Sequence, residues 1–110
     1  MIIAVIGSRG ICEFDFELLG VTRTDVVLTG GAGGVDAWAE AAARRRGVAC
    51  EVMRPDYARY GRAAPHVRND AIVKACDRVV AIWDGVSKGT ASVIKKAKKY
   101  GKPAKIFRVA

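Results

Sequence analysis

Two glycine-bearing loops hold the residues of this chain that are best suited to bind an anion. Each loop follows a short apolar run rich in β-branched residues and opens an amphipathic helical pattern. This placement leaves unpaired backbone N–H groups at the positive end of a helix, where phosphate binds well. The loops are Thr29-Gly30-Gly31-Ala32-Gly33-Gly34-Val35-Asp36 and Trp83-Asp84-Gly85-Val86-Ser87-Lys88-Gly89-Thr90-Ala91-Ser92. Together they predict a nucleotide-like ligand with phosphate at one end.

The first loop is the stronger signal. Four glycines within Gly30–Gly34 permit positive φ and a close approach of the main chain to a bulky anion. The loop is not the G-x-G-x-x-G dinucleotide fingerprint, which requires a glycine where Asp36 stands, and it lacks the Gly-Lys-Ser/Thr of a P-loop. Asp36 falls in the first helical turn, where it either holds a sugar hydroxyl or only complements the helix dipole. We favour an anion-binding loop over a purely structural turn.

A third polar segment follows the first apolar run of the chain. Gly7-Ser8-Arg9 supplies a small turn, a hydroxyl and a guanidinium. Arg9 is suited to pair bidentately with phosphate or carboxylate, although a surface arginine without a ligand is the alternative. In the second glycine-bearing loop, Ser87 and Thr90 are either helix N-caps or phosphate ligands, and both roles use the same geometry.

Two carboxylates and one basic segment complete the set of candidates. Asp84, directly after an apolar run, and Asp36 are the weak catalytic candidates. The segment 54–69 is the longest irregular stretch; its arginines and aromatics either cover a base or ribose as a lid or form an ordinary surface loop. Arg68 and Asn69 begin a helix there and can reach a second phosphate or sugar. A single histidine and the absence of G-x-S-x-G make a serine hydrolase triad improbable.

Strand-like and helical patterns alternate along the whole chain and must position these residues. Helical patterns are predicted at about 12–19, 34–46, 65–76 and 89–100. The predicted strands are Ile2–Ile6, Val26–Thr29, Val48–Met53, Arg78–Trp83 and Lys105–Val109. The alternation indicates an α/β fold: a Rossmann-like three-layer sandwich with a five-stranded, mostly parallel sheet.

The expected strand order is 3-2-1-4-5, with right-handed crossovers. Ligands bind such sheets beyond the carboxyl ends of the strands, where the strand order reverses. This point lies between the first and fourth strands. The three polar loops are therefore expected along one edge of the sheet.

Length and composition set the remaining limits. The 110 residues are predicted to form a single domain, and folding should bury about two-thirds of the surface that the unfolded chain exposes. No apolar run reaches the roughly 18 residues that span a bilayer, so no membrane partner is expected. Three widely spaced cysteines are expected to be reduced, mostly buried thiols of a cytoplasmic protein. With one histidine and no C-x-x-C pair, no metal site is expected, and no cofactor is required beyond a nucleotide-derived ligand.

Basic residues are concentrated at the C-terminal end of the chain, which carries most of the net charge of +8. No acidic residue follows Asp84, whereas eight basic residues do: Lys88, Lys95, Lys96, Lys98, Lys99, Lys102, Lys105 and Arg108. This basic surface either attracts nucleic acid or is the solvated face of a helix whose apolar stripe points inward.

The motifs resemble those of the SLOG superfamily, which groups the DNA-processing Smf/DprA proteins, the LOG phosphoribohydrolases and small YpsA/YspA-like proteins. The likeness runs nearly end to end and is closest to the short stand-alone YspA/YpsA-like members. It rests on Gly-Ser-Arg after the first strand, Thr-Gly-Gly-Ala-Gly-Gly-Val-Asp, then Arg-Asn and Gly-Thr. It implies a Rossmann-like fold, frequent homodimers, and nucleotide-derived ligands such as relatives of ADP-ribose. The implied site is Gly7, Ser8, Arg9, Gly30, Gly31, Ala32, Gly33, Gly34, Asp36, Arg68, Asn69, Gly89 and Thr90.

One position departs from the LOG pattern. LOG enzymes carry a catalytic glutamate three residues after the loop threonine, and this chain has Val93 there. Valine cannot stabilise an oxocarbenium-like centre or activate water, so hydrolysis would require another carboxylate. The leading hypothesis is therefore a sensor or carrier that binds a nucleoside monophosphate or an ADP-ribose-like ligand. The alternatives are a LOG-like nucleoside 5′-monophosphate phosphoribohydrolase and a DprA-like single-stranded nucleic acid binder.

Overall fold

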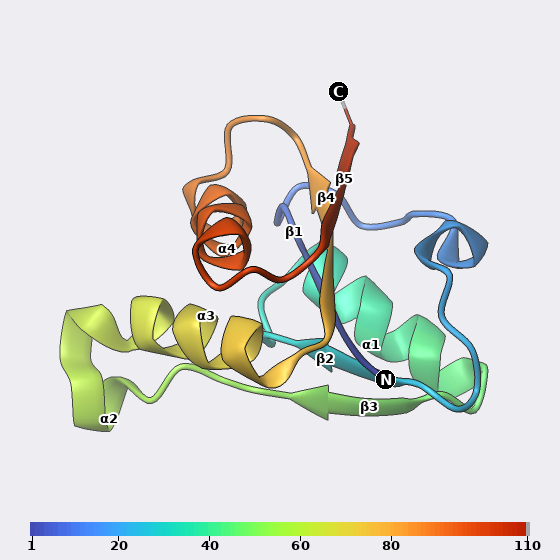
Figure 1. Ribbon diagram of the computed structural model, residues 1–110, viewed down its shortest axis with the longest axis horizontal. Coiled ribbons are helices and arrows are strands. Elements are labelled where there is room, and N and C mark those ends of the chain that lie inside the picture. The colour runs from blue at the N-terminus through green and yellow to red at the C-terminus, as the bar shows by residue number, and fades with distance from the viewer. Residues whose placement is uncertain (110) are drawn as a thin grey trace.

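All five strands run parallel in one sheet (Figure 1). The computed structural model describes residues 1–109. The strand order β3-β2-β1-β4-β5 confirms the predicted order, and the sheet is parallel throughout. The strands are β1 (Ile2–Gly7), β2 (Val26–Thr29), β3 (Ala49–Val52), β4 (Arg78–Trp83) and β5 (Ala104–Arg108).

Helices cover both faces of the sheet and complete the expected three layers. Helix α1 (Val35–Arg45) lies on one face, and α3 (Ala64–Ala75) and α4 (Lys88–Lys99) lie on the other (Figure 1). Glycine ends two of these helices: Gly47 follows α1 with φ +70° and Gly101 follows α4 with φ +68°, because positive φ costs glycine little.

The two faces of the sheet have separate cores. On the α1 side, Val5, Val27 and Ile82 pack against Val35 and Ala39 of the helix. On the other side, the buried set comprises Ala4, Ile6, Leu28, Ile72, Val73, Cys76, Val79, Val93 and Ala97. Central strands of a parallel sheet are covered on both faces, which explains their uninterrupted apolar runs.

The first predicted helix is wrong. Instead of a helix over 12–19, the chain forms only the short 3₁₀ helix η1 (Phe16–Leu19). Its bounds are set locally: the Asp15 carboxylate accepts the Glu17 N–H at 3.0 Å, and Gly20 ends the turn with φ +66°. Phe16 and Leu19 still reach the core.

The irregular segment 54–69 is largely helical. It contains the single-turn helix α2 (Tyr57–Tyr60), the 3₁₀ turn η2 (Gly61–Ala63) and the start of α3. Asp56 begins α2 by accepting the Arg59 N–H at 3.1 Å. A single turn leaves too few residues for an apolar periodicity, so the pattern was not visible in the sequence.

Within residues 1–109, no helix is long and apolar enough to cross a membrane. All three cysteines are free thiols. Cys76 is buried and Cys50 half-buried, but Cys12 is exposed, contrary to the expectation of mostly buried thiols. Cys12 lies in the irregular segment between β1 and η1, where no element covers it.

Candidate functional site

A cavity of about 360 Å³ lies at the carboxyl edge of the sheet, beside the neighbouring strands β1 and β4. This is the point where the strand order reverses, as expected for a ligand site in such a fold. Residues that are far apart in the sequence meet here. The lining consists of Ile6, Gly7, Ser8, Arg9, Gly10, Ala32, Asp36, Pro65, Arg68, Asn69, Ser87, Lys88, Gly89 and Thr90. Most of the predicted site residues thus line one cavity.

A second cavity of about 340 Å³ adjoins the first. The two share Arg9, Ala32, Pro65 and Arg68 as lining residues. The second cavity adds Gly30, Gly31, Arg54, Pro55 and Tyr57. The edge of the sheet therefore carries two adjacent cavities with two arginines between them.

Three predicted site residues, Gly33, Gly34 and Asp84, line neither cavity. Gly34 instead has a structural role: its φ is +73°, and a Cβ there would overlap the backbone of Arg9. Gly33 is exposed, and a Cβ added to it would meet no atom within 4 Å. The glycines of this loop therefore have different roles, which their number alone did not reveal.

The Asp36 carboxylate organises the glycine loop from inside. It is 3% exposed and accepts backbone N–H groups from Gly7 at 3.3 Å, Gly30 at 3.0 Å and Ala32 at 3.4 Å. Burial raises the pKa of Asp36 above its ordinary value, and these N–H groups partly oppose that rise. These three amides are already paired. They are therefore not available to a ligand.

Arg68 holds the same loop from the other side. Its Nη1 donates to the carbonyl oxygens of Gly30 and, at 3.5 Å, Met53, and its Nε donates to Asn69 Oδ1 at 2.8 Å. Its Nη2 donates to no acceptor within residues 1–109. A half-buried guanidinium fixed in this way presents its remaining N–H groups in a set direction.

Asp84 shapes the loop before α4. Its carboxylate accepts the N–H groups of Val86 and Ser87, each at 2.8 Å, and the Ser87 hydroxyl at 2.9 Å. These bonds, led by the Val86 amide, lower the pKa of Asp84 from 3.8 to about 2. The N–H of Asp84 in turn donates to Ser8 Oγ at 3.0 Å. This hydrogen bond ties the loops after β1 and β4 together.

The first turn of α4 supplies free donors to the first cavity. The Ser87 hydroxyl donates to Asp84 and does not cap the helix. The N–H groups of Lys88, Gly89 and Thr90 have no acceptor within the described chain, as the geometry of a helix N-terminus dictates. All three residues line the cavity, and no atom lies within 4 Å of a Cβ added to Gly89. The three unpaired amides therefore belong to residues that line the first cavity.

Sequence reasoning missed several lining residues. Lys88 lies in the second glycine-bearing loop and Pro65 in the segment 54–69, but neither is among the predicted ligands. Arg54 and Tyr57 belonged to the proposed lid, and Tyr57 remains 59% exposed. The signal for Arg54 is its position two residues after the end of β3, because the parallel strands of this sheet all end at the same edge.

The lining of the two cavities is strongly basic. Arg9, Arg54, Arg68 and Lys88 contribute positive charge, and Asp36 is the one acidic residue among the lining residues. Such a charge balance attracts anions. At the third residue after Thr90, Val93 is fully buried in the core, so no carboxylate enters the cavity from that position.

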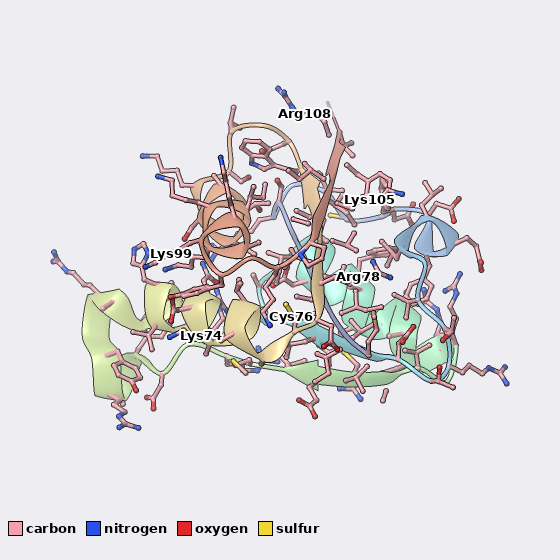
Figure 2. All side chains as sticks on the ribbon, in the orientation of Figure 1. Lys74, Cys76, Arg78, Lys99, Lys105 and Arg108 are labelled. Carbon is pink, nitrogen blue, oxygen red and sulfur yellow. The ribbon has the colours of Figure 1, made fainter. Side chains whose placement is uncertain are left out.

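The basic C-terminal residues do not form one surface at this site. Figure 2 shows Lys99 on α4, and Lys105 and Arg108 on β5. Several make structural contacts: the Lys102 Nζ donates to the Cys76 carbonyl at 2.7 Å, and Lys96 lies 3.7 Å from Asp70. Of the C-terminal basic residues, Lys88 alone is among the residues that line these two cavities.

The fold and the site together define a Rossmann-like α/β protein with a basic double cavity at the carboxyl edge of its sheet. No protein-family model matches the chain, and no curated protein matches it. Within residues 1–109, His, Cys, Asp and Glu side chains nowhere gather in a group of three that could hold a metal ion.

Proposed function

We propose that this protein binds a nucleotide or nucleotide-derived ligand, with a phosphate at the first turn of α4. The observation that carries the proposal is that Lys88, Gly89 and Thr90, whose backbone N–H groups are unpaired within residues 1–109, line the same cavity as Arg9 and Arg68. Helix N-terminal amides and arginine are the groups that bind phosphate best in proteins. The cavity volume of about 360 Å³ suits a small ligand.

A binding role without chemistry agrees with the state of the carboxylates. Hydrolysis of an N-glycosidic bond requires an acid, base or nucleophile near the anomeric carbon. Asp36 is occupied by three backbone N–H groups, and Asp84 is bonded on both oxygens and lines neither cavity. Val93 takes the position of the LOG glutamate. We therefore favour a sensor or carrier, and infer membership of the SLOG superfamily from the motifs alone.

The decisive experiment is isothermal titration calorimetry with AMP on the full chain and on two variants at one position. Gly89→Ala keeps the amide and fits the open space, so affinity should be retained. Gly89→Asp places a carboxylate among the phosphate donors and should abolish binding. Asp in the first helical turn favours the helix, by about 0.3–1 kcal/mol, so the loss of binding cannot be attributed to unfolding.

Thermal unfolding provides a second readout. AMP at about 100 times its dissociation constant should stabilise the protein by roughly 2.7 kcal/mol. The proposal fails if no nucleotide binds, or if Gly89→Asp binds AMP as well as Gly89→Ala does. Release of free adenine during the titration would instead assign the hydrolase function.

A further inference from the structure

The second cavity has its own set of cationic side chains. Arg9, Arg54 and Arg68 line it, and its lining contains no carboxylate. The guanidinium of Arg9 forms no hydrogen bond or ion pair within residues 1–109. Arg54 donates to one backbone oxygen, that of Gly31 at 3.2 Å. Three guanidinium groups thus line about 340 Å³, and none of them forms an ion pair within residues 1–109. Asp36 is close enough to interact electrostatically with Arg68.

The glycine loop is built to admit two of these guanidinium groups. A Cβ on Gly30 would lie 2.7 Å from Arg68 Nη1, and a Cβ on Gly31 would lie 2.7 Å from Arg54 Nη1. Both contacts are closer than real Cβ atoms allow. A side chain at either position would have to displace an arginine, and at Gly31 the φ of +74° also disfavours any other residue. Two glycines of the loop thus lie directly against arginine side chains.

The hydrogen bonds of these arginines position them without neutralising them. Their partners in this loop are neutral carbonyl oxygens, of Gly31 for Arg54 and of Gly30 for Arg68. The nearby carboxylate of Asp36 is bonded to N–H groups of the same loop. The free N–H groups of a fixed guanidinium are suited to a bidentate contact with a phosphate.

We infer that the second cavity binds a second phosphate of the same ligand, so that the ligand is a nucleotide with two phosphate groups and not a nucleoside monophosphate. This inference rests on the proposed function, because the first phosphate occupies the first turn of α4. The shared residues Arg9, Ala32, Pro65 and Arg68 make the cavities adjacent, so that one molecule can reach both. The second phosphate either extends from the first, as in ADP, or lies across the ribose, as in adenosine 3′,5′-bisphosphate.

The test is calorimetry with AMP, ADP and adenosine 3′,5′-bisphosphate at one fixed salt concentration. A charge-assisted contact to the second phosphate should make one of the two longer ligands bind about tenfold or more tighter than AMP. Arg54→Ala should remove this advantage and leave the AMP affinity within about twofold. The ligand that shows the advantage identifies where the second phosphate lies.

Two further variants make the test specific. Arg59→Ala removes a neighbouring arginine that lines neither cavity and whose guanidinium lies over the Tyr60 ring at 5.2 Å, and it should retain the full advantage. If Tyr57 contacts no phosphate, Tyr57→Ala should lower the affinities for all three nucleotides by the same factor or leave all three unchanged.

The outcomes separate the two proposals. Equal affinities for all three nucleotides, or an advantage that survives Arg54→Ala, overturn the second phosphate site and leave the proposed function standing. Loss of AMP affinity itself in Tyr57→Ala, combined with no advantage of the longer ligands, assigns the second cavity to the base and also overturns this inference. If none of the three nucleotides binds, the proposed function itself is overturned, and the second phosphate site falls with it.

Discussion

Asp36 and Arg68 hold the same glycine from opposite sides. The carboxylate of Asp36 accepts the Gly30 N–H at 3.0 Å, and the guanidinium of Arg68 donates to the Gly30 carbonyl. One residue belongs to α1 and the other to α3, so the loop after β2 is fixed by both helical layers. Each of these charged side chains hydrogen-bonds to the protein backbone and also lines the first cavity.

The first prediction concerns the carboxylate. Asp36→Asn replaces one acceptor oxygen by an NH₂ group, which leaves at least one buried backbone N–H without a partner. We expect a loss of about 1–3 kcal/mol in the free energy of unfolding, measured by urea denaturation. Glu40→Gln is the matched control in the same helix: it weakens an exposed pair with Arg44 and should change stability by less than about 1 kcal/mol. Equal effects of the two substitutions would contradict the role given to Asp36.

The second prediction compares two adjacent glycines. Gly34 has φ +73° and touches the Arg9 backbone, so Gly34→Ala should destabilise the protein by at least about 2 kcal/mol. Gly33→Ala places its methyl group in open space, at a φ that is not positive, and should change stability by less than about 0.5 kcal/mol. Urea denaturation of both variants decides; a Gly33→Ala that unfolds as easily as Gly34→Ala would refute the assignment.

The sheet was predictable because each central strand is an uninterrupted apolar run between clear turn signals. Val26–Thr29 and Arg78–Trp83 have the predicted bounds, and α1 and α4 differ by about one residue at each end. The predicted helix at 12–19 is wrong, and this segment contains Phe14 and Phe16. Their rings instead pack against Trp38 and, for Phe14, Phe107, contacts between distant segments that local periodicity cannot reveal.

The position of the site was predictable from strand order, but the roles of its residues were not. The carboxyl edge of a parallel sheet brings the loops after β1, β2 and β4 together whatever their sequence. The sequence does not reveal that the Asp36 side chain folds back onto the amides of Gly30 and Ala32. Nor does it reveal that Arg54 packs on Gly31, since this depends on the register of β2 against β3.

The third prediction concerns acid stability. Asp84 has a pKa of about 2 in the folded protein and an ordinary value of 3.8. The unfolded chain therefore takes up a proton first as the pH falls, and the stability contributed by Asp84 is present above pH 3.8 and is lost as the pH falls toward 2. Asp84→Asn should be less stable than the wild type at pH 6, and the difference should shrink as the pH falls through this range.

Urea denaturation at pH 6, 4, 3 and 2.5 measures this difference. Asp70 also has a pKa of about 2, held down first by the Tyr100 hydroxyl and then by Lys74, so the wild type loses further stability in the same range. Glu13→Gln, at an exposed position, is the control. A difference between wild type and Asp84→Asn that stays constant from pH 6 to 2.5 would show that the loop bonds of Asp84 do not persist in solution.

The fourth prediction separates the basic helix face from the cavities. Lys95, Lys98 and Lys99 are exposed on α4 and line neither cavity. The triple substitution to Gln should leave the stability unchanged within about 0.5 kcal/mol per position and the AMP affinity within about twofold. Calorimetry with AMP measures the second quantity; a large loss of affinity would place the ligand across α4 and not at its first turn.

The same variant tests nucleic acid binding. If these lysines contact a single strand, the wild type binds an oligonucleotide with a log–log salt slope steeper than that of the variant by about 2, since each lost phosphate contact accounts for roughly 0.7.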